Sequence, residues 1–467
     1  MVGYLVIFGY IFFLIFVIGI VTKKLINGSF SRKIIHILLL FVWIFINHFF
    51  KNTIHQIIIP IIFLIVNVIS YKFKLFKTIE REEDNHLGTI YFAIGISIMM
   101  AISYVYPQFF TYSGVSVICL CLGDGTASLL GYAIGKNKIY NNKTYLGFVS
   151  CIIATFIGLF IFKFFFFKEL SVIVIFLIAI VTGIIELVDL GLDNLTTTLV
   201  PFTLLIITNG LNDLNAIIAL GLATIIFFII YFSKSITYYG SLLSMLVVFS
   251  FTYYGGYNAV IYLLICYFIV FIISFIKNKI IKNDKENKTR CLIQIAANGL
   301  IGMIFCILSY YFNKDLLIIS MISIGGCFID SISSDVGVLS KKQPYDIFKR
   351  KRVTKGLSGG VSVLGTVSSL IGSLFLGLLI TLLVKTNLNN FIIYTLIIFF
   401  NTVIDTIFGS LIQVKYQCQK CNEITERKEH CNIVTNYYSG IKFIDNNFVN
   451  VLANICTVLL ACITLFI

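Results

Sequence analysis

Residues 258–276, NAVIYLLICYFIVFIISFI, form a run of nineteen residues without a charged side chain. A run of about 20 apolar residues is long enough to cross a bilayer as an α-helix. Hydrophobic residues make up 59% of the 467-residue chain and charged residues 12%, whereas a typical soluble domain has about 25% charged residues. The sequence therefore predicts an integral membrane protein and excludes a water-soluble globular one.

Comparable runs recur along the chain and predict an all-α fold, a polytopic transmembrane helical bundle of about 15–16 segments in two halves. The run 198–209 is too short to be trusted as a full span. The predicted segments are 3–21, 34–50, 54–71, 88–106, 113–135, 146–167, 171–190, 198–209, 215–233, 236–253, 258–276, 291–312, 316–336, 358–384, 391–413 and 447–467.

The basic residues give a topology for these segments. Thirty of the 35 lysine and arginine residues fall in alternate loops, which the positive-inside rule places in the cytoplasm. Both termini are then outside, and residues 2–21 form the first span rather than a signal peptide. The net charge of +14 is explained by basic cytoplasmic loops that set the topology and contact anionic lipid. It therefore requires no nucleic-acid partner. The alternative is that some of these cations hold phosphates.

The chain lacks a Pro- or Ser-rich linker, so the boundary between its halves is set by the polar turn at 209–213. We expect one membrane domain at 1–210 and a second at 211–467. The second would carry a cytoplasmic loop with cysteines and histidine at 414–446.

Asp124 is the most informative residue of the first half. It lies in the apolar, small-residue stretch GDGTASLLGYAIGK (123–136), and a carboxylate at membrane depth costs several kcal/mol unless it has a partner or a function. Small residues there either let helices pack closely or let a ligand approach the backbone. Asp124 with the lysines beyond Gly135 has the components that a nucleotide triphosphate with Mg²⁺ requires.

Other polar residues of the first half can join this site. Arg32 and His36 are four positions apart and share one face of a helix. They are either a basic residue at the membrane interface and a buried core histidine, or residues that contact a ligand. Glu186 lies in a predicted span and is expensive there without a role. Asp193 and Asn194 follow it at the start of the next segment.

Five motifs of this half resemble the phytol kinase and dolichol kinase family. They are RKIIH (32–36), Glu80-x7-Gly-Thr, GDGTASLLGYAIGK, KTYLG (143–147) and Glu186-x6-Asp-Asn. The GD-A-G and KT-G portion also looks like the membrane cytidylyltransferases. The resemblance implies a CTP-using membrane kinase with Asp124 at the metal and nucleotide and with His36 and Glu186 as candidate bases. The residues implied at nucleotide or phosphate are Arg32, Lys33, Gly123, Gly125, Gly131, Lys136, Lys143, Thr144, Asp193 and Asn194.

The second half repeats the theme with different motifs. Arg290, Gln294 and Asn298 are spaced four residues apart and so share one face of a helix. They form either a structural hydrogen-bond network between helices or a ligand site. Asp330 and Asp335 lie in one predicted span, about 140° apart if it stays helical. A basic loop then leads into the glycine- and serine-rich stretch 356–366, which we expect to bind phosphate rather than serve only topology and packing. Asp405 is a further acid within a span.

These motifs resemble the family of phytyl-phosphate kinases, which includes many uncharacterised membrane proteins. The resemblance covers about 290–454, and the motif DSISSD (330–335) departs from the family pattern by lacking its aromatic residue. It implies a second phosphorylation, with Mg²⁺ held by Asp330, Asp335 and Asp405 as it would be by Asp124 in the first half. The residues implied at phosphate are Arg290, Gln294, Asn298, Lys355, Gly359, Gly360 and Ser362.

Cys418, Cys421, His430 and Cys431 follow Asp405 in the loop 414–446. These residue types are ligands for tetrahedral Zn²⁺, and a reducing cytoplasmic loop favours metal over a disulfide. The neighbouring positions of His430 and Cys431 count against a shared metal. A structural zinc, a redox role and no metal all remain open.

The leading hypothesis is a fused membrane kinase that phosphorylates an isoprenoid alcohol and then the prenyl phosphate to its diphosphate. Its partners would be these lipids, CTP or another nucleotide triphosphate with Mg²⁺, and the bilayer, and its active sites would face the cytoplasm. One alternative is a cytidylyltransferase that forms a CDP-lipid. Another is a lipid-phosphate transporter or flippase, although the sequence has no convincing repeat beyond the recurring aspartates with small neighbours. The sequence leaves the oligomeric state open.

Overall fold

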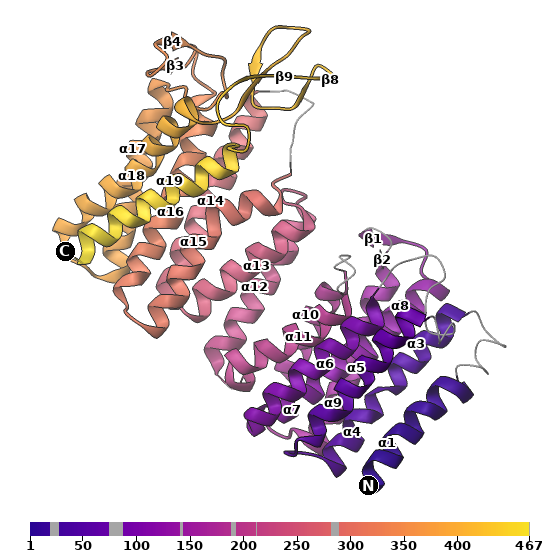
Figure 1. The fold of residues 1–467 in the computed structure, drawn as a ribbon. Helices are drawn as coiled ribbons and strands as arrows, with labels where there is room; N and C mark the ends of the chain where they lie inside the picture. Colours follow the sequence, from indigo (N-terminus) through magenta and orange to yellow (C-terminus); the bar gives the residue numbers. More distant parts are fainter. Residues whose placement is uncertain are drawn as a thin grey trace. The chain divides into compact units, whose positions relative to one another are not determined.

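The computed structural model describes residues 1–18, 28–73, 87–140, 143–187, 193–211, 213–281 and 289–466, without the side chains of 17, 18, 28–32 and 466. The chain forms two compact units, Met1–Ile217 and Ile218–Ile467. The division falls inside the helix Leu214–Phe232. Figure 1 shows each unit as a bundle of helices.

The first unit is built mainly of helices. Helix α6 packs against α5 and α11, and helix α9 packs against α8 and α10. The elements are α1 (Val2–Phe13), η1 (Leu14–Ile18), α3 (Gly28–Leu38), α4 (Leu40–Phe49), α5 (His55–Phe73), α6 (Gly88–Val105), η2 (Pro107–Phe109), α7 (Phe110–Ile118), η3 (Cys119–Asp124), α8 (Gly125–Ala133), β1 (Lys138–Tyr140), β2 (Lys143–Thr144), α9 (Tyr145–Phe166), α10 (Val172–Glu186), α11 (Asp193–Ile207) and η4 (Asn209–Leu211).

The second unit has longer helices and more strands. Its helix α16 packs against α14, α15, α17, α18 and α19. The elements from the boundary onward are α12 (Leu214–Phe232), α13 (Tyr238–Tyr253), α14 (Gly256–Ile280), α15 (Leu292–Tyr311), α16 (Asp315–Gly337), β3 (Tyr345–Asp346), β4 (Lys351–Arg352), α17 (Val363–Val384), α18 (Leu388–Leu411), β5 (Lys415–Gln417), β6 (Ile424–Thr425), β7 (Glu429–His430), β8 (Ile433–Val434), β9 (Asn436–Ser439) and α19 (Asn446–Phe466).

The predicted all-α polytopic fold is confirmed. Among the described residues, 11 helices are long and apolar enough to cross a membrane. Within the described residues each predicted segment overlaps a helix or a run of joined helices, but the segment 358–384 was predicted to start too early, because α17 begins at Val363. The run 198–209 belongs to α11, which begins earlier, at Asp193, and has 15 residues.

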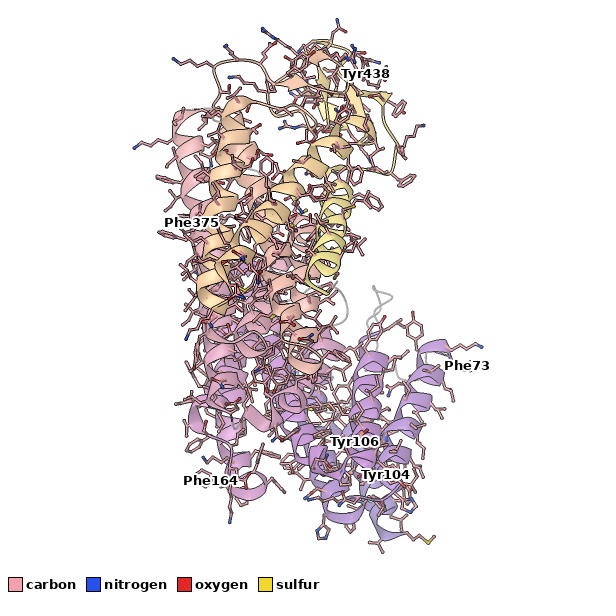
Figure 2. All side chains as sticks on the ribbon, turned by 90° about the vertical axis from the view of Figure 1, so that its left-hand side faces the viewer. Phe73, Tyr104, Tyr106, Phe164, Phe375 and Tyr438 are labelled. Atoms are coloured by element: carbon pink, nitrogen blue, oxygen red, sulfur yellow. The ribbon has the colours of Figure 1, made fainter. Side chains whose placement is uncertain are left out.

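The helices expose large apolar side chains, as expected of surfaces that meet lipid. Figure 2 shows Phe164 and Phe375 projecting outward from their helices, and their side chains are 58% and 48% exposed. A water-soluble protein rarely exposes apolar surface on this scale. The protein is therefore an integral membrane protein in contact with the bilayer.

The strands are short and connect helix ends. Strands β1 and β2 form an antiparallel hairpin between α8 and α9, and β3 and β4 form one between α16 and α17. Between α18 and α19 the strands form a small sheet of order β6-β5-β9 and the separate hairpin β7-β8. Figure 1 shows the strands of the second unit together at one end of its helices.

Candidate functional sites

Asp124 ends a π-helical stretch in the middle of a long helix. Residues Cys119–Asp124 form the π-helix η3 between α7 and α8, within a helical span from Pro107 to Ala133. π-helical turns inside α-helices are rare and often lie at functional sites. The Asp124 side chain is only 1% exposed, so its carboxylate needs partners inside the protein.

Helix α3 supplies those partners. Lys33 Nζ lies 2.7 Å from Asp124 Oδ2. His36 Nε2 lies 3.0 Å from the Leu120 carbonyl oxygen and 3.5 Å from Asp124 Oδ2. The structure therefore brings the RKIIH motif to Asp124, although the side chain of Arg32 lies outside the described residues.

Lys143 joins the remaining acids to this group. Its Nζ donates a hydrogen bond of 2.6 Å to Glu186 Oε1, and the Glu186 side chain is only 3% exposed. Burial alone would lower the pKa of Lys143, but the carboxylates of Glu186, Asp124 and Asp193 outweigh burial and raise it. Six predicted site residues thus form one electrostatic cluster, which we call the first site: Lys33, His36, Asp124, Lys143, Glu186 and Asp193.

The predicted glycines of this motif are points of close helix packing. A Cβ at Gly125 would collide with Ile37, and one at Gly123 would lie 2.6 Å from Thr155 Oγ1. A Cβ at Gly131 would lie 3.3 Å from the Gly147 Cα. These contacts favour the packing interpretation for the glycines and hold the helix of Asp124 against its neighbours.

The other predicted residues lie around the first site or outside it. Thr144 caps α9 by accepting a hydrogen bond of 3.1 Å from the Gly147 backbone nitrogen. Asn194 donates to the Gly88 carbonyl oxygen at 2.8 Å, and Lys136 is exposed. The acidic run from Glu80 lies outside the described residues.

The second unit contains a cavity of about 530 Å³. Its lining includes residues of α15, α16, α17, α18 and the loop between α16 and α17. Nine predicted residues of the second half line it: Arg290, Gln294, Asn298, Asp330, Asp335, Gly359, Gly360, Ser362 and Asp405. Lys355 is exposed and lies outside this lining.

The three acids of the cavity have different surroundings. Asp330 and Asp405 are contributed by α16 and α18. Asn450, with its amide oriented to satisfy its neighbours, donates to Asp405 Oδ1 at 3.0 Å. Asp335, also in α16, accepts hydrogen bonds from Lys277 Nζ at 2.7 Å and from the Ser274 hydroxyl. The Asp335 charge is thus paired with a cation.

The predicted polar face of α15 needs one correction. Gln294 and Asn298 lie in the helix, but α15 begins at Leu292 and Arg290 precedes it. Arg290 instead forms a β-bridge with Ile236. The Gln294 side chain accepts a hydrogen bond of 3.1 Å from the Cys291 backbone nitrogen and so caps the helix. All three residues still line the cavity.

The glycine-rich segment 356–362 forms another wall of the cavity. Gly359 has a φ of +84°, and a Cβ there would lie 2.6 Å from the Ser410 backbone nitrogen in α18. Both polar backbone atoms of Ser358 are bound by the loop after α18. Its nitrogen donates to Glu426 Oε1 at 2.6 Å, and its oxygen accepts from Lys415 Nζ at 2.8 Å.

Sequence reasoning missed several residues around the cavity. Lys277, Lys415 and Glu426 lie in basic or polar segments that resemble ordinary membrane-flanking loops. Asn450 lies in the second turn of α19, in the asparagine-rich run 446–450, which was a weak signal for it. None of these residues has a spacing that identifies its partner, because the contacts join elements far apart in the sequence.

The two units repeat one local arrangement. Asp124 and Gly131 are seven positions apart, as are Asp330 and Gly337. Thr144 and Ser362 each cap the next helix by accepting from the nitrogen of the glycine three residues on. A Cβ added to Gly147 would lie 3.0 Å from the Ala127 carbonyl oxygen, and one added to Gly365 would lie 2.9 Å from the Ser333 carbonyl oxygen. In each unit this oxygen belongs to the residue three positions after the aspartate. In both units a hairpin joins the two helices.

Comparison with known proteins places the chain among membrane proteins. The family model described as "Integral membrane protein DUF92" matches residues 221–458, which include Asp330, Asp335 and Asp405. An uncharacterized membrane protein from Methanocaldococcus jannaschii is 32% identical over 127 residues, or 27% of this chain and 53% of that protein. The chain thus spans about half the length of this relative. No solved structure matches the chain.

Proposed function

This chain belongs to the integral membrane protein DUF92 family, and we propose that it is a membrane phosphotransferase with one site in each unit. The first site would phosphorylate an isoprenoid alcohol with CTP or another nucleotide triphosphate. The second would convert the prenyl phosphate to its diphosphate. The basic loops predict that both sites open to the cytoplasm.

The observation that carries this proposal is the repeated arrangement around Asp124 and Asp330. In each unit an aspartate is contributed by a helix that packs, through a pair of glycines, against the capped start of the next helix. Two related sites in one chain suit two related reactions, because the product of the first reaction has the lipid tail and the phosphate that the second must bind.

The first site has the charges that phosphoryl transfer needs. Lys33 and Lys143 are paired with Asp124 and Glu186, and phosphate oxygens can take over these cations. The freed carboxylates are the kind of ligand that Mg²⁺ prefers. When bound, Mg²⁺ neutralises charge on the transferred phosphate.

An alcohol acceptor also requires a base. In the proposed step the alcohol oxygen forms a bond to the γ-phosphorus, the bond from that phosphorus to the bridging oxygen breaks, and the nucleoside diphosphate leaves. The hydroxyl proton goes to His36, because Asp124 lies 3.5 Å from His36 Nε2 and stabilises the imidazolium. Glu186 is the less suitable base because its carboxylate, once freed from Lys143, would serve as a ligand of Mg²⁺.

The cavity of the second unit fits the second step. Its volume of about 530 Å³ lies in the usual range for ligand pockets, about 300–1,000 Å³. None of the described residues that line it is a histidine. A phosphate acceptor oxygen is already deprotonated near neutral pH and needs no base. Asp330 and Asp405 would hold Mg²⁺ opposite the glycine-rich segment 356–362.

Nucleotide labelling tests the reaction class. The purified chain in lipid nanodiscs is incubated with a panel of prenols and CTP labelled either at the γ-phosphate or in the cytosine ring, and the lipid products are weighed. The proposal expects the γ-label on prenyl phosphate and diphosphate, and loss of both products in the double variant Asp124→Asn/Asp330→Asn. Asp315→Asn, an exposed acid at the start of α16, is the matched control and stays active.

Two outcomes would overturn the proposal. Cytosine label retained on the lipid would identify a cytidylyltransferase. Uptake of prenyl phosphate by proteoliposomes without nucleotide consumption would identify a transporter.

A further inference from the structure

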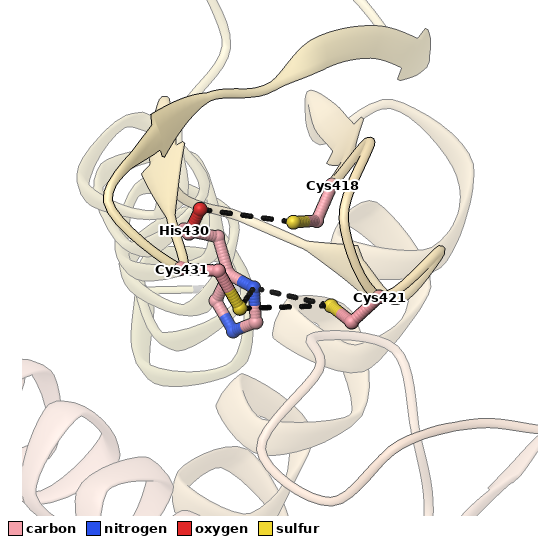
Figure 3. Close-up of side chains that lie close together, drawn as sticks. All are labelled: Cys418, Cys421, His430 and Cys431. Carbon is pink, nitrogen blue, oxygen red and sulfur yellow. Dashed lines mark hydrogen bonds between the residues drawn. The ribbon is translucent and has the colours of Figure 1, made fainter.

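Two turns of the loop between α18 and α19 bring together four side chains with metal-binding atoms. Cys418 and Cys421 lie in the turn between β5 and β6, and His430 and Cys431 lie at the turn between β7 and β8. One ligand atom from each residue lies within 4.8 Å of the other three. Figure 3 shows the three thiols and the imidazole facing a common centre.

The separations are close to those of a tetrahedral site. Cys421 Sγ lies 3.4 Å from His430 Nδ1 and 3.9 Å from Cys431 Sγ, and Cys431 Sγ lies 3.3 Å from His430 Nδ1. Tetrahedral Zn²⁺ with Zn–S bonds of about 2.3 Å and Zn–N bonds of about 2.0–2.1 Å requires ligand separations of about 3.5–3.8 Å. These three separations are thus close to those of a zinc site, and the Cys418 ligand atom lies within 4.8 Å of the other three.

The backbone explains how neighbouring residues share one centre. Cys431 has a φ of +54° and Asn432 has a φ of +61°, so the chain turns sharply in the left-handed region where His430 and Cys431 meet. His430 pairs with Ile433 across this turn, and positive φ at both central residues is the geometry of a type I′ hairpin turn. The hairpin therefore holds Cys431 next to His430.

The imidazole has a second partner suited to a metal ligand. His430 Nε2 lies 4.0 Å from Glu423 Oε2, while Nδ1 faces the thiols. A carboxylate near the second nitrogen of a ligating histidine orients the ring and increases its basicity. With three thiolates and one imidazole, the residue types favour Zn²⁺ over Mg²⁺ or Ca²⁺.

We propose that Cys418, Cys421, His430 and Cys431 bind one Zn²⁺, and that this zinc holds the glycine-rich wall of the cavity in place. Glu426 lies between the two ligand pairs in sequence and accepts the hydrogen bond from the Ser358 nitrogen. Lys415, three residues before the first ligand, donates to the Ser358 oxygen. Zinc that fixes both turns therefore fixes both contacts to the wall. This inference holds whether or not the cavity binds prenyl phosphate.

Metal content tests the first part of the proposal. The full chain, purified in detergent from zinc-supplemented cells, is measured by elemental analysis and, after cobalt exchange, by visible absorption. We expect about one zinc per chain and the bands of tetrahedral cobalt thiolate, both lost in Cys421→Ser/Cys431→Ser. Cys462→Ser, a cysteine of α19, is the control and keeps the metal.

Absence of zinc from the wild-type chain would overturn the site, as would a Cys421–Cys431 disulfide revealed by mass in the non-reduced protein.

Hydrogen exchange tests the second part. Chelation of zinc is expected to speed amide exchange in residues 357–360 by about tenfold or more, the effect of losing a hydrogen bond to a charged group. Glu426→Ala is expected to give the same increase while retaining zinc. Unchanged exchange in both experiments with zinc bound in the starting protein would refute the positioning role and leave only the metal site.

Discussion

Lys143 Nζ lies 2.6 Å from Glu186 Oε1, and this contact joins the hairpin before α9 to the end of α10. The two residues lie far apart in the sequence, yet their pairing brings the KTYLG motif and the Glu-x6-Asp-Asn motif to Asp124. Because Glu186 is buried, its charge depends on this lysine.

Lys143→Met should therefore leave an unpaired buried carboxylate and destabilise the first unit by about 3 kcal/mol. Glu186→Gln in the same chain should recover part of the loss, with a coupling energy between about 0.5 and 3 kcal/mol. Thermal unfolding of the two single variants and the double variant in detergent measures this. Additive losses would show that the two side chains do not form a pair.

Gly365→Ala should disturb the contact between α16 and α17. The added methyl group would lie 2.9 Å from the Ser333 carbonyl oxygen, and overpacking of this kind costs about 1–3 kcal/mol. Gly221→Ala in α12 is the matched control, because no atom of a neighbouring described residue lies within 4 Å of its added Cβ and alanine favours a helix by about 1 kcal/mol. Equal melting temperatures for the two variants would argue against the close contact.

Gly359→Ala should damage the cavity more than Gly356→Ala. Both glycines have a φ of +84°, so both variants carry the left-handed strain of about 1–2 kcal/mol. Only the Cβ at position 359 would also collide with the backbone of Ser410, since within the described part of the chain no neighbouring atom comes within 4 Å of the one at 356. Prenyl phosphate binding, measured by calorimetry, should fall strongly for Gly359→Ala alone. A similar loss in both variants would assign the effect to strain.

Because of Lys415, the stability of the second unit should change with pH in the alkaline range. Burial, and then the nearby Lys349 ammonium, lower the pKa of Lys415 from 10.5 to about 8. Between these values the unfolded chain holds a proton that the folded chain has lost, so stability rises with pH in this window. The melting temperature should rise relative to that of Lys415→Met between about pH 8 and pH 10. A constant difference would contradict the lowered pKa.

The sequence predicted the spans and much of both sites for a clear physical reason. Apolar runs and buried acids are strong signals in a membrane protein, and Asp124, Glu186, Asp330 and Asp405 were all found as charges out of place. The four proposed zinc ligands were recognised by type, but the left-handed turn at Cys431, which places its thiol near His430, has no marker in the sequence.

The repeat between the units was not recognised from the sequence. The shared positions lie in two short stretches. They are the aspartate with the serine four and the glycine seven residues on, and the hydroxyl cap with the x-Leu-Gly-x-Val-Ser that follows it. The π-helical turn before Asp124 also shifts the helical register of the first unit relative to α16. The pairing of Lys277 with Asp335 was missed because a lysine at a helix end has the same appearance as a topology signal.

The most direct test of the two-site account is the activity of Asp124→Asn and Asp330→Asn, each on a prenol and on its monophosphate. The account predicts that Asp124→Asn loses prenol phosphorylation by about 100-fold or more while still converting supplied monophosphate to diphosphate. It predicts that Asp330→Asn accumulates the monophosphate. Loss of both reactions in either properly folded variant, or of neither, would contradict the assignment of one reaction to each unit.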